Sequence, residues 1–389
     1  MKRDEPVKTI AILGTLPPIR GLSSYCLEFA TALSTRFTVE FISFKNIYPA
    51  FLYPGGNLEE DQTYPAIKRT AIHVRRCLNW YNPFSWITEG AFTKADLLHA
   101  QWWSLPLFPI YLVICLWFKL RGKPVIFTVH NVLPHERSLL FVKLSHLLFS
   151  VGDHFIVHSN MSRRQMMIHY HIPQERISVI PHGSLDFYVR SRVDSRELRR
   201  EMGFFENDKI ILLFGAIREY KGIDVAIKAL PEIVRHIPKA RLLVAGKLWE
   251  DWTPYDHLIQ QLKLSDYVSL HLEYIPSNQV YKYFEIADLA IFPYRRFGGQ
   301  SGAGSAAIAF RKPMIVSNVG GLPDLVADAR CIVPPGNHSA LARAVVDGLK
   351  HPNIIEQMTS DAECISNKFS WVNIADKTAE IYRKRLNPK

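Results

Sequence analysis

Short apolar segments alternate with amphipathic segments along nearly the whole chain, a pattern typical of repeated β-α units and parallel sheets. In the first half, runs of large apolar and β-branched residues predict strands at Thr9–Gly14, Val39–Phe44, Asp96–Ala100, Val125–His130, His154–His158 and Ile177–Ile180. Helices are expected between them at Leu22–Leu33 and Glu136–Ser150. The first half therefore predicts one parallel sheet with helices on its faces.

The alternation pauses near residues 181–192 and a charged helix, Ser195–Met202, follows. A second series of strands is then expected at Lys209–Phe214, Arg241–Ala245, Tyr267–Leu272, Leu289–Phe292 and Met314–Ser317, with helices at Ile223–Leu230, Asn278–Glu285 and Ser305–Phe310. A chain of 389 residues is longer than one hydrophobic core usually serves, so we expect two domains. We predict two Rossmann-like, doubly wound α/β domains, residues 1–185 and 186–369, facing each other. Ligands in such sheets bind beyond the carboxyl ends of the strands.

The segment Leu97–Phe118 contains no formally charged residue and is rich in large apolar side chains. Two prolines, a histidine and a glutamine interrupt it, so it does not read as a membrane-spanning helix. Two hypotheses stay open. In one, a buried strand, Leu97–Ala100, leads through a turn into a core helix. In the other, the helix lies in a bilayer interface with Lys119, Arg121 and Lys123 on lipid headgroups.

The formal charge of +11 favours polyanionic partners such as nucleotide phosphates or an anionic membrane. No basic run is interleaved with aromatic residues, so we expect no nucleic acid. The five cysteines are scattered and form no C-x-x-C pair, and no signal-peptide pattern precedes Thr9. This composition indicates a cytoplasmic protein with reduced thiols. We also expect no metal site, because no D-x-D and no metal-ligand spacing of histidines occur.

Two predicted β-α junctions in the first half carry candidate binding residues. The loop of residues 13–25 follows a strand and precedes a helix, so its backbone N–H groups could hold an anion. Gly21 in that loop would allow a phosphate or sugar to approach closely. His130 ends another predicted strand, where an imidazole can bond a hydroxyl or a phosphate. An ordinary turn and a structural histidine are the alternative interpretations.

A third junction, FGAIREYKG at residues 214–222, brings two cations to the start of a helix. Gly215 follows the strand directly, and Arg218 and Lys221 precede the helix. Fixed cations beside a helix N-terminus suit a diphosphate and the negative charge that grows on it as it leaves. A charged surface turn is the alternative.

The stretch FGGQSGAGSAAIAFRKP, residues 297–313, is rich in glycine and contains no acidic residue. Within it Gly302–Ala307 satisfies G-x-G-x-x-A, the dinucleotide-binding fingerprint. That fingerprint requires glycines directly after a strand and an acid at the end of the next strand. Here nine residues, 293–301, separate the strand from Gly302, and Asn318 follows the next strand. A nicotinamide-dependent enzyme is therefore a minor alternative.

Together with IPHG (180–183) and SNVGGLPDLV (317–326), these motifs resemble the retaining glycosyltransferases of family 4. The resemblance implies the GT-B fold, two Rossmann-like domains with the active site in the cleft between them. It also implies that His130 contacts the donor sugar and that Lys221 holds the donor diphosphate.

The same resemblance extends to the rest of the chain. The loop His271–Pro276, with Tyr274 and Ile275, corresponds to the segment that meets the nucleobase. A C-terminal helix near residues 370–389 is expected to pack back on the first domain.

Two departures from the family pattern affect the expected site. The family arginine directly follows the glycine, where this chain has Ala216, and we take Arg218 as its substitute. The two family glutamates would fall at Gly298 and Ala306, neither of which is acidic. A Q-S-G turn is similar to that of exopolysaccharide-assembly branches of the family. The donor-binding residues expected from the whole chain are Gly21, Gly215, Tyr274, Ile275, Gln300, Ser301, Gly302, Ala303 and Gly304.

We therefore expect a metal-independent retaining hexosyltransferase with His130, Arg218 and Lys221 as catalytic residues. A UDP- or GDP-sugar would be its donor and co-substrate, and no further cofactor is expected. The expected acceptor is a glycan or lipid-linked glycan in cell-surface polysaccharide synthesis, with peripheral contact at the inner face of an anionic membrane. The absent glutamates keep a catalytically silent glycan-binding or scaffold protein open as an alternative, and a phosphorylase is a weaker one.

Overall fold

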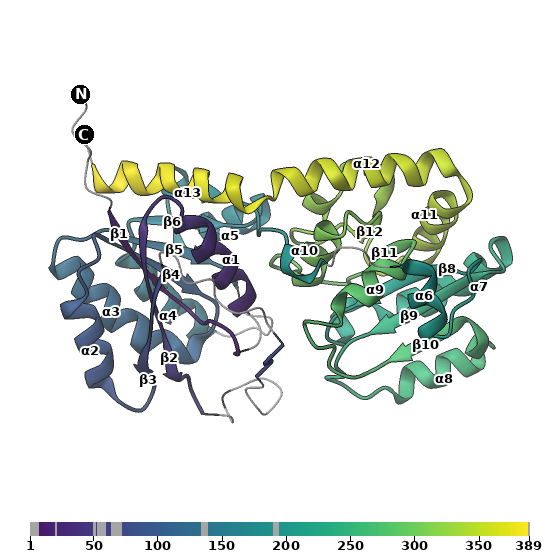
Figure 1. Ribbon diagram of the computed structural model, residues 1–389, viewed down its shortest axis with the longest axis horizontal. Helices are drawn as coiled ribbons and strands as arrows, with labels where there is room; N and C mark the ends of the chain where they lie inside the picture. Colours follow the sequence, from purple (N-terminus) through teal and green to yellow (C-terminus); the bar gives the residue numbers. More distant parts are fainter. Residues whose placement is uncertain are drawn as a thin grey trace. The chain divides into compact units, whose positions relative to one another are not determined.

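The computed structural model describes residues 8–19, 22–49, 52, 60–63, 72–133, 139–189 and 194–387. Its contacts divide the chain into two compact units. Unit 1 comprises Met1–Gly183 and Ser370–Lys389, and unit 2 comprises Ser184–Phe369. Each unit is an α/β layer structure built around one parallel sheet (Figure 1).

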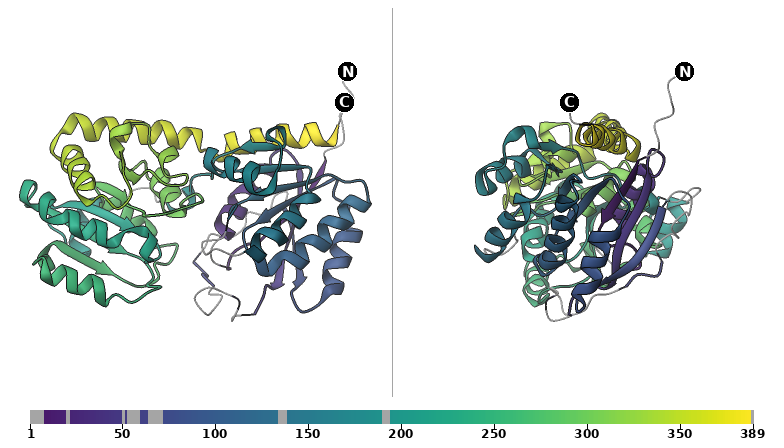
Figure 2. Two further views of the ribbon diagram at one scale, coloured as in Figure 1. Left: turned by 180° about the vertical axis from the view of Figure 1, so that it is seen from behind. Right: turned by 90° about the vertical axis from the view of Figure 1, so that its left-hand side faces the viewer.

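Unit 1 is built on a parallel sheet with the strand order β3-β2-β1-β4-β5-β6-β7. The strands are β1 (Thr9–Leu13), β2 (Thr38–Asn46), β3 (Ile72–Asn79), β4 (Leu97–Trp102), β5 (Val125–Val129), β6 (His154–Val157) and β7 (Ile177–Val179). The helices are α1 (Ser23–Leu33), α2 (Pro83–Phe92), α3 (Phe108–Leu120), α4 (Leu139–Ser150), α5 (Asn160–Tyr170) and α13 (Trp371–Leu386). Two separate apolar clusters on the sheet show that helices cover both of its faces (Figure 2).

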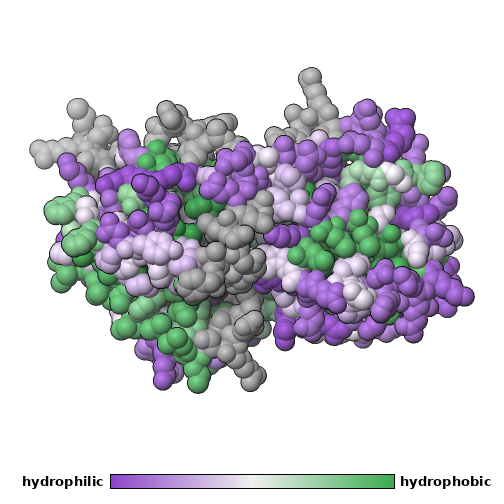
Figure 3. Space-filling model, turned by 90° about the horizontal axis from the view of Figure 1, so that it is seen from below, coloured by the Kyte–Doolittle hydropathy of each residue, from purple (hydrophilic) through white to green (hydrophobic). Residues whose placement is uncertain are grey.

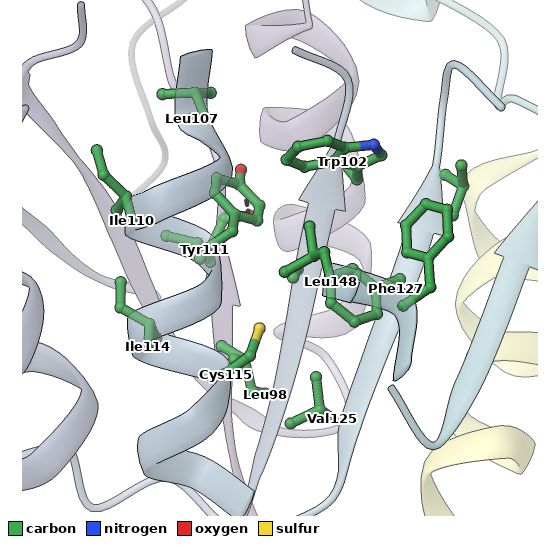
Figure 4. Packing of buried hydrophobic residues seen from close by; sticks show 14 of the residues in the cluster. Leu98, Trp102, Leu107, Ile110, Tyr111, Ile114, Cys115, Val125, Phe127 and Leu148 are labelled. Atoms are coloured by element: carbon green, nitrogen blue, oxygen red, sulfur yellow. Dashed lines mark hydrogen bonds between the residues drawn. The ribbon is translucent and has the colours of Figure 1, made fainter. Parts of the chain in front are cut away.

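The segment Leu97–Phe118 forms the buried strand β4 and the core helix α3. Trp102 is fully buried, and Tyr111 of α3 donates a hydrogen bond to the carbonyl oxygen of Gln101 at 2.8 Å. Figure 4 shows α3 packed on β4 and β5 through Ile110, Tyr111, Ile114 and Cys115. No helix in the described residues is both long enough and apolar enough to cross a membrane.

The basic residues in the last turn of α3 and just after it form bonds within unit 1. Lys119 pairs with Asp153 at 2.7 Å, and Lys123 pairs with Asp96 at 3.2 Å. Arg121 donates to the carbonyl oxygens of Gly90 and Thr93. These bonds support the core-helix hypothesis for this segment.

Helix α13 belongs to unit 1, although it is the last element of the chain. Its buried residues Trp371, Ile374, Ala375 and Tyr382 join the same cluster as α1. The Tyr382 hydroxyl lies 2.5 Å from Nδ1 of His99, a fully buried residue of β4. The chain therefore leaves unit 1 after β7 and completes its core only at the C-terminus.

Unit 2 has a parallel sheet with the order β10-β9-β8-β11-β12-β13. Its strands are β8 (Lys209–Phe214), β9 (Ala240–Ala245), β10 (Val268–His271), β11 (Leu289–Phe292), β12 (Met314–Ser317) and β13 (Ile332–Val333). Its helices are α6 (Ser195–Glu201), α7 (Ile223–His236), α8 (Thr253–Gln261), α9 (Val280–Ile286), α10 (Gly302–Ala309), α11 (His338–Lys350) and α12 (Pro352–Lys368).

Several elements differ from the sequence prediction. Strand β3 was not expected, because alternating exposure along it places charged residues such as Arg75 and Arg76 within the strand. The short edge strand β13 and helix α2 were also missed. Helix α10 begins at Gly302, three residues before the expected start, because the Ser301 side chain caps it.

Candidate functional site

The carboxyl ends of β8 and β11 mark the point where strand order reverses in the sheet of unit 2. Numbered within that sheet, the strand order is 3-2-1-4-5-6, and β8 and β11 are strands 1 and 4. Ligands of doubly wound sheets bind at this crevice. The two junctions meet there closely, because the Arg295 N–H donates to the Tyr220 carbonyl at 2.7 Å. A Cβ on Gly222 would lie 2.0 Å from the Pro293 carbonyl oxygen.

Lys221 occupies this point with a buried ammonium. Lys221 is 6% exposed and is the last residue of a short helical turn, Glu219–Lys221. Gly222 ends this turn with a φ of 71°. The Nζ atom lies against the α-carbon of Gly215, since a Cβ there would approach it to 2.6 Å. Burial first, and the Arg218 charge second, lower the pKa of Lys221 to about 8. Within the described residues, no carboxylate or other acceptor bonds this ammonium.

The first turn of α10 faces the same glycine. A Cβ on Gly215 would lie 3.4 Å from Cβ of Ala303. The Ser301 hydroxyl accepts a hydrogen bond from the Gly304 N–H at 3.2 Å and lies 3.1 Å from the Tyr294 hydroxyl. The first turn contains no acidic residue. An amino-terminal helix end beside a buried ammonium makes a site for a polyanion.

The loop before α10 rests on two glycines that follow β12. A Cβ on Gly320 would lie 2.7 Å from the Phe297 carbonyl oxygen, and the Gly321 N–H donates to the Gly299 carbonyl at 3.1 Å. The Gln300 amide lies against Gly321, where a Cβ would come within 2.7 Å of Nε2. A side chain at position 320 would therefore meet the loop backbone, and one at position 321 would displace the Gln300 amide.

The two positions where the family resemblance places glutamates have different surroundings. Ala306 is 1% exposed and packs in the core of unit 2. A Cβ on Gly298 would meet open space. No carboxylate stands at either position, so the loop depends on Gln300, Ser301 and backbone groups.

Arg218 contacts an aromatic ring that the sequence analysis did not single out. Its guanidinium carbon lies 3.9 Å from the centroid of the Trp249 ring, in the loop after β9. Among the described residues, no acceptor bonds the Arg218 side chain. The only signal in the sequence was a tryptophan four residues after the end of β9, and spacing does not indicate which residue it contacts.

Tyr274 and Ile275 lie just after β10 in the same sheet. Ile275 is 8% exposed and belongs to the core, while Tyr274 is partly buried. An open hollow beside them is lined by His271, Ile275 and Tyr283. The end of β10 is bonded to the end of β9, because the His271 carbonyl accepts a hydrogen bond from the Gly246 N–H at 2.9 Å.

The structure places His130 in unit 1, at the end of β5, within a network of ring side chains. Its Nε2 lies 2.9 Å from Oε1 of Gln101, and its Nδ1 lies 3.1 Å from Nε2 of His158. Tyr25 contacts the ring edge to face, with centroids 4.8 Å apart. Burial first, and then the neighbouring histidine charges, holds the pKa of His130 well below its usual value. His130 is therefore a neutral imidazole at pH 7.

The remaining candidates of the first half are not described. Gly21 lies outside the described residues, as does Glu136, the first residue of the expected helix Glu136–Ser150. In the described part of the chain, no group of three His, Cys, Asp or Glu side chains is arranged to hold a metal ion.

Two family models match consecutive halves of the chain. The one described as Glycosyltransferase Family 4 matches residues 19–184. The one described as Glycosyl transferases group 1 matches residues 194–364. Together they leave only the ends and a short connecting segment unmatched.

Curated relatives match over part of their length. An uncharacterized glycosyltransferase of Methanocaldococcus jannaschii is 29% identical over 224 residues, which are 55% of this chain and 55% of that protein. A D-inositol 3-phosphate glycosyltransferase of Segniliparus rotundus is 25% identical over 61% of this chain and 54% of its own length. The chain thus spans about half the length of the curated relatives it matches.

Solved structures match nearly the whole chain. The Anabaena protein HepE, in complex with UDP and glucose, superposes with a TM-score of 0.72 at 18% identity, covering 97% of this chain and all of that one. WaaG, described as a glycosyltransferase involved in lipopolysaccharide biosynthesis, gives a TM-score of 0.64 at 16% identity and covers 96% of this chain and 99% of WaaG. These likenesses show the GT-B fold, and they confirm the fold predicted from the sequence.

Proposed function

Because this chain belongs to glycosyltransferase family 4, a family of retaining, metal-independent enzymes with the GT-B fold, we propose that it transfers a hexose from a nucleoside diphosphate sugar to a hydroxyl acceptor. UDP is the nucleotide bound in the solved relative HepE, and we propose a UDP- or GDP-linked donor here. The donor site we propose lies in unit 2 at the ends of β8 and β11.

One observation supports this proposal above the others: the buried ammonium of Lys221 has no anionic partner in the described protein. Keeping a charge in such a place costs free energy unless a ligand supplies the opposite charge. Arg218 adds a second cation, which no carboxylate of the described residues neutralises. A diphosphate supplies two negative charges and accepts hydrogen bonds from both side chains.

The same groups would act on the reaction as well as on binding. Negative charge develops on the diphosphate as its bond to the sugar breaks, so Lys221 and Arg218 would bind the transition state more strongly than the donor. The first turn of α10 would add backbone N–H donors. We propose that His130 orients the donor sugar; since both of its ring nitrogens already have partners in unit 1, the sugar would have to share or replace one.

The experiment is a thermal-shift screen of UDP- and GDP-sugars with the wild type and a Lys221→Met variant. A donor that binds only the folded state raises its stability by about 2.7 kcal/mol at 100 times its Kd. We expect one nucleotide class to raise Tm of the wild type and to have little effect on the variant. Stabilisation by nicotinamide dinucleotide, with none by any nucleotide sugar, would falsify the proposal.

The absent glutamates support a second candidate, a catalytically silent glycan-binding protein. Ala306 is packed into the core and Gly298 carries no side chain, so neither offers a carboxylate to a donor ribose or sugar. Slow hydrolysis of a bound nucleotide sugar that disappears in Lys221→Met would exclude this candidate. Donor binding without any hydrolysis or transfer would favour it.

For the acceptor we propose a glycan or lipid-linked glycan in cell-surface polysaccharide synthesis, at the inner face of a membrane. An exposed apolar surface of unit 1 supports this. It lies on the outer sides of α2, α3 and α4, where the exposed large apolar residues are Phe84, Ile87, Phe92, Leu116, Leu120, Leu139, Leu140 and Leu147. We call this surface the α2–α4 face. Apolar colour gathers on the lower part of unit 1, at the left of Figure 3.

The charges of the α2–α4 face suit anionic lipids. The three helices contain a single acidic residue, Glu89, which is 4% exposed and paired with Arg75. Lys94 and Lys143 are exposed and form no ion pair in the described protein. Apolar side chains next to cations bind a bilayer by burial and by attraction to its surface charge. Trp102, which belongs to the apolar segment Leu97–Phe118, is fully buried and does not contribute to this face.

Co-sedimentation with phosphatidylcholine vesicles, with and without phosphatidylserine, tests the acceptor side. We expect binding to the anionic vesicles that weakens with salt and is reduced in a Phe84→Ser, Leu120→Ser variant. Phe205→Ser, in unit 2, is the matched control, because Phe205 is 71% exposed. Equal behaviour of all three proteins towards vesicles would point to a soluble acceptor.

A further inference from the structure

Two loops of unit 2 continue their backbone pairing beyond the sheet, at the carboxyl ends of β8 and β9. The Ile217 N–H donates to the Lys247 carbonyl at 2.8 Å, and the Trp249 N–H donates to the Ile217 carbonyl at 3.2 Å. Ile217 and Leu248 form an isolated parallel bridge. The backbone thus fixes Leu248 opposite Ile217, so that Trp249 and Arg218, the residues that follow these two, lie level with each other.

Arg218 leaves this paired segment in an extended conformation, with a φ of −146° and a ψ of 144°. Its guanidinium carbon stands 3.9 Å from the centroid of the Trp249 ring, a distance that places the cation directly against the indole. A guanidinium over an indole face is held by its attraction to the ring quadrupole. The contact leaves the planar edge of the guanidinium, which carries its N–H groups, free to bind an oxyanion.

The acidic residues that directly follow Arg218 and Trp249 in the sequence, Glu219 and Glu250, do not compete for the Arg218 guanidinium. Glu250 accepts hydrogen bonds from the Glu219 N–H and from the Tyr255 hydroxyl. Glu219 itself faces Arg296 at 3.7 Å, at the surface. An aromatic ring can therefore fix the position of Arg218 without neutralising its charge, which a carboxylate would do.

We propose that Trp249 is a positioning residue, which holds the Arg218 guanidinium in the orientation that binds the donor diphosphate. The proposal rests on the proposed function, because it assigns Arg218 to the diphosphate. Trp249 itself need not touch the donor. Its effect on donor binding passes through Arg218 and should disappear when Arg218 is absent.

A double-mutant cycle tests this dependence. The Kd for UDP and for GDP is measured calorimetrically for the wild type, Trp249→Leu, Arg218→Ala and the double variant. For the nucleotide that binds, we expect Trp249→Leu to raise Kd about 5- to 30-fold, the range of a partly desolvated cation–π contact. In the Arg218→Ala background the same change should alter Kd less than about 2-fold.

Two further variants separate positioning from folding. Trp249→Phe keeps an aromatic face and should bind within about 3-fold of the wild type. Phe205→Leu, another exposed aromatic of unit 2, should leave Kd unchanged. Trp249 is 36% exposed, so its replacement should leave the fold intact, and Tm records this.

The outcomes distinguish this proposal from the proposed function. If the fold-change in Kd of the double variant equals the product of the fold-changes of Trp249→Leu and Arg218→Ala, the positioning role is overturned. An unchanged Kd in Trp249→Leu would also overturn it. Failure of the wild type to bind either nucleotide would overturn the proposed function itself.

Discussion

The Lys221 ammonium lies 5.4 Å from the centroid of the Tyr294 ring. The two residues follow β8 and β11, the strands between which the order of the unit 2 sheet reverses. An aromatic face and the α-carbon of Gly215 hold this cation without neutralising it. The arrangement keeps a buried positive charge available for a ligand that brings negative charge into the crevice.

Replacing Lys221 should separate stability from activity. Lys221→Met keeps the volume of the side chain and removes a buried charge without a counter-ion, so we expect Tm without ligand to stay the same or rise. The rate of sugar transfer or of donor hydrolysis should fall by a factor of about 100 or more, since the charge acts chiefly in the transition state. Calorimetry and steady-state kinetics measure the two effects. An unchanged kcat would remove Lys221 from the mechanism.

Nucleotide binding should weaken as pH rises through about 8. The pKa of Lys221 is lowered from 10.5 to about 8, so below pH 8 the free protein carries the ammonium and above it a neutral amine. Kd for the bound nucleotide should therefore rise about tenfold between pH 7 and pH 9, with uptake of one proton on binding at the higher pH.

The matched control for this pH effect is Lys221→Arg, whose guanidinium stays charged throughout the range. Titrations in buffers of different ionisation enthalpy report the proton uptake. A wild-type Kd that stays flat to pH 9 would contradict the assignment of the titrating group. The same pKa shift predicts that, for this group alone, the ligand-free protein gains stability between pH 8 and pH 10.5, because there only the unfolded chain binds the proton.

A methyl group at position 321 should disturb the donor loop. A Cβ on Gly321 would lie 2.7 Å from Nε2 of Gln300 and 3.2 Å from the Gly299 carbonyl oxygen. We expect Gly321→Ala to displace the Gln300 amide and to raise the donor KM severalfold, with a small loss of Tm. The control is Gly298→Ala, because a Cβ at that position meets open space. Gly336→Ala would not serve, because its φ of 74° would add backbone strain. Equal KM values for the two variants would argue against a role of Gln300.

Chelators should leave activity intact. Lys221, Arg218 and the start of α10 supply the positive field that the leaving diphosphate requires, and family 4 is metal-independent. We expect the same rate in EDTA and in added Mg²⁺ or Mn²⁺. A strict requirement for either ion would contradict the proposed stabilisation of the leaving group.

Removing one hydroxyl should weaken the attachment of α13 to unit 1. In Tyr382→Phe the His99 Nδ1 loses its partner while both residues stay buried, which costs about 1–3 kcal/mol. Tm should fall by a few degrees. Tyr81→Phe, at a tyrosine that is 64% exposed, should leave it unchanged. The same Tm for both variants would show that the hydroxyl contributes nothing.

The periodicity of the chain predicted most of the strands because buried parallel strands are short, apolar and flanked by polar turns. Strands β8, β11 and β12 have the predicted bounds. The pattern failed at β3, an edge strand whose outward side chains are charged, and at the two-residue strand β13. It also started α10 too late, since a helix start rich in glycine, serine and alanine carries no amphipathic signal.

The sequence by itself determined the parallel α/β class, the order of motifs and the junction that carries Gly215, Arg218 and Lys221, because spacing along one chain segment is a local property. Only the tertiary structure decided what those side chains meet. Trp249 stands 31 positions after Arg218, yet strand register brings its indole ring against the Arg218 guanidinium. His130 finds partners on two other strands for the same reason. Contacts between the ends of neighbouring strands follow from sheet order and register, which local patterns do not contain.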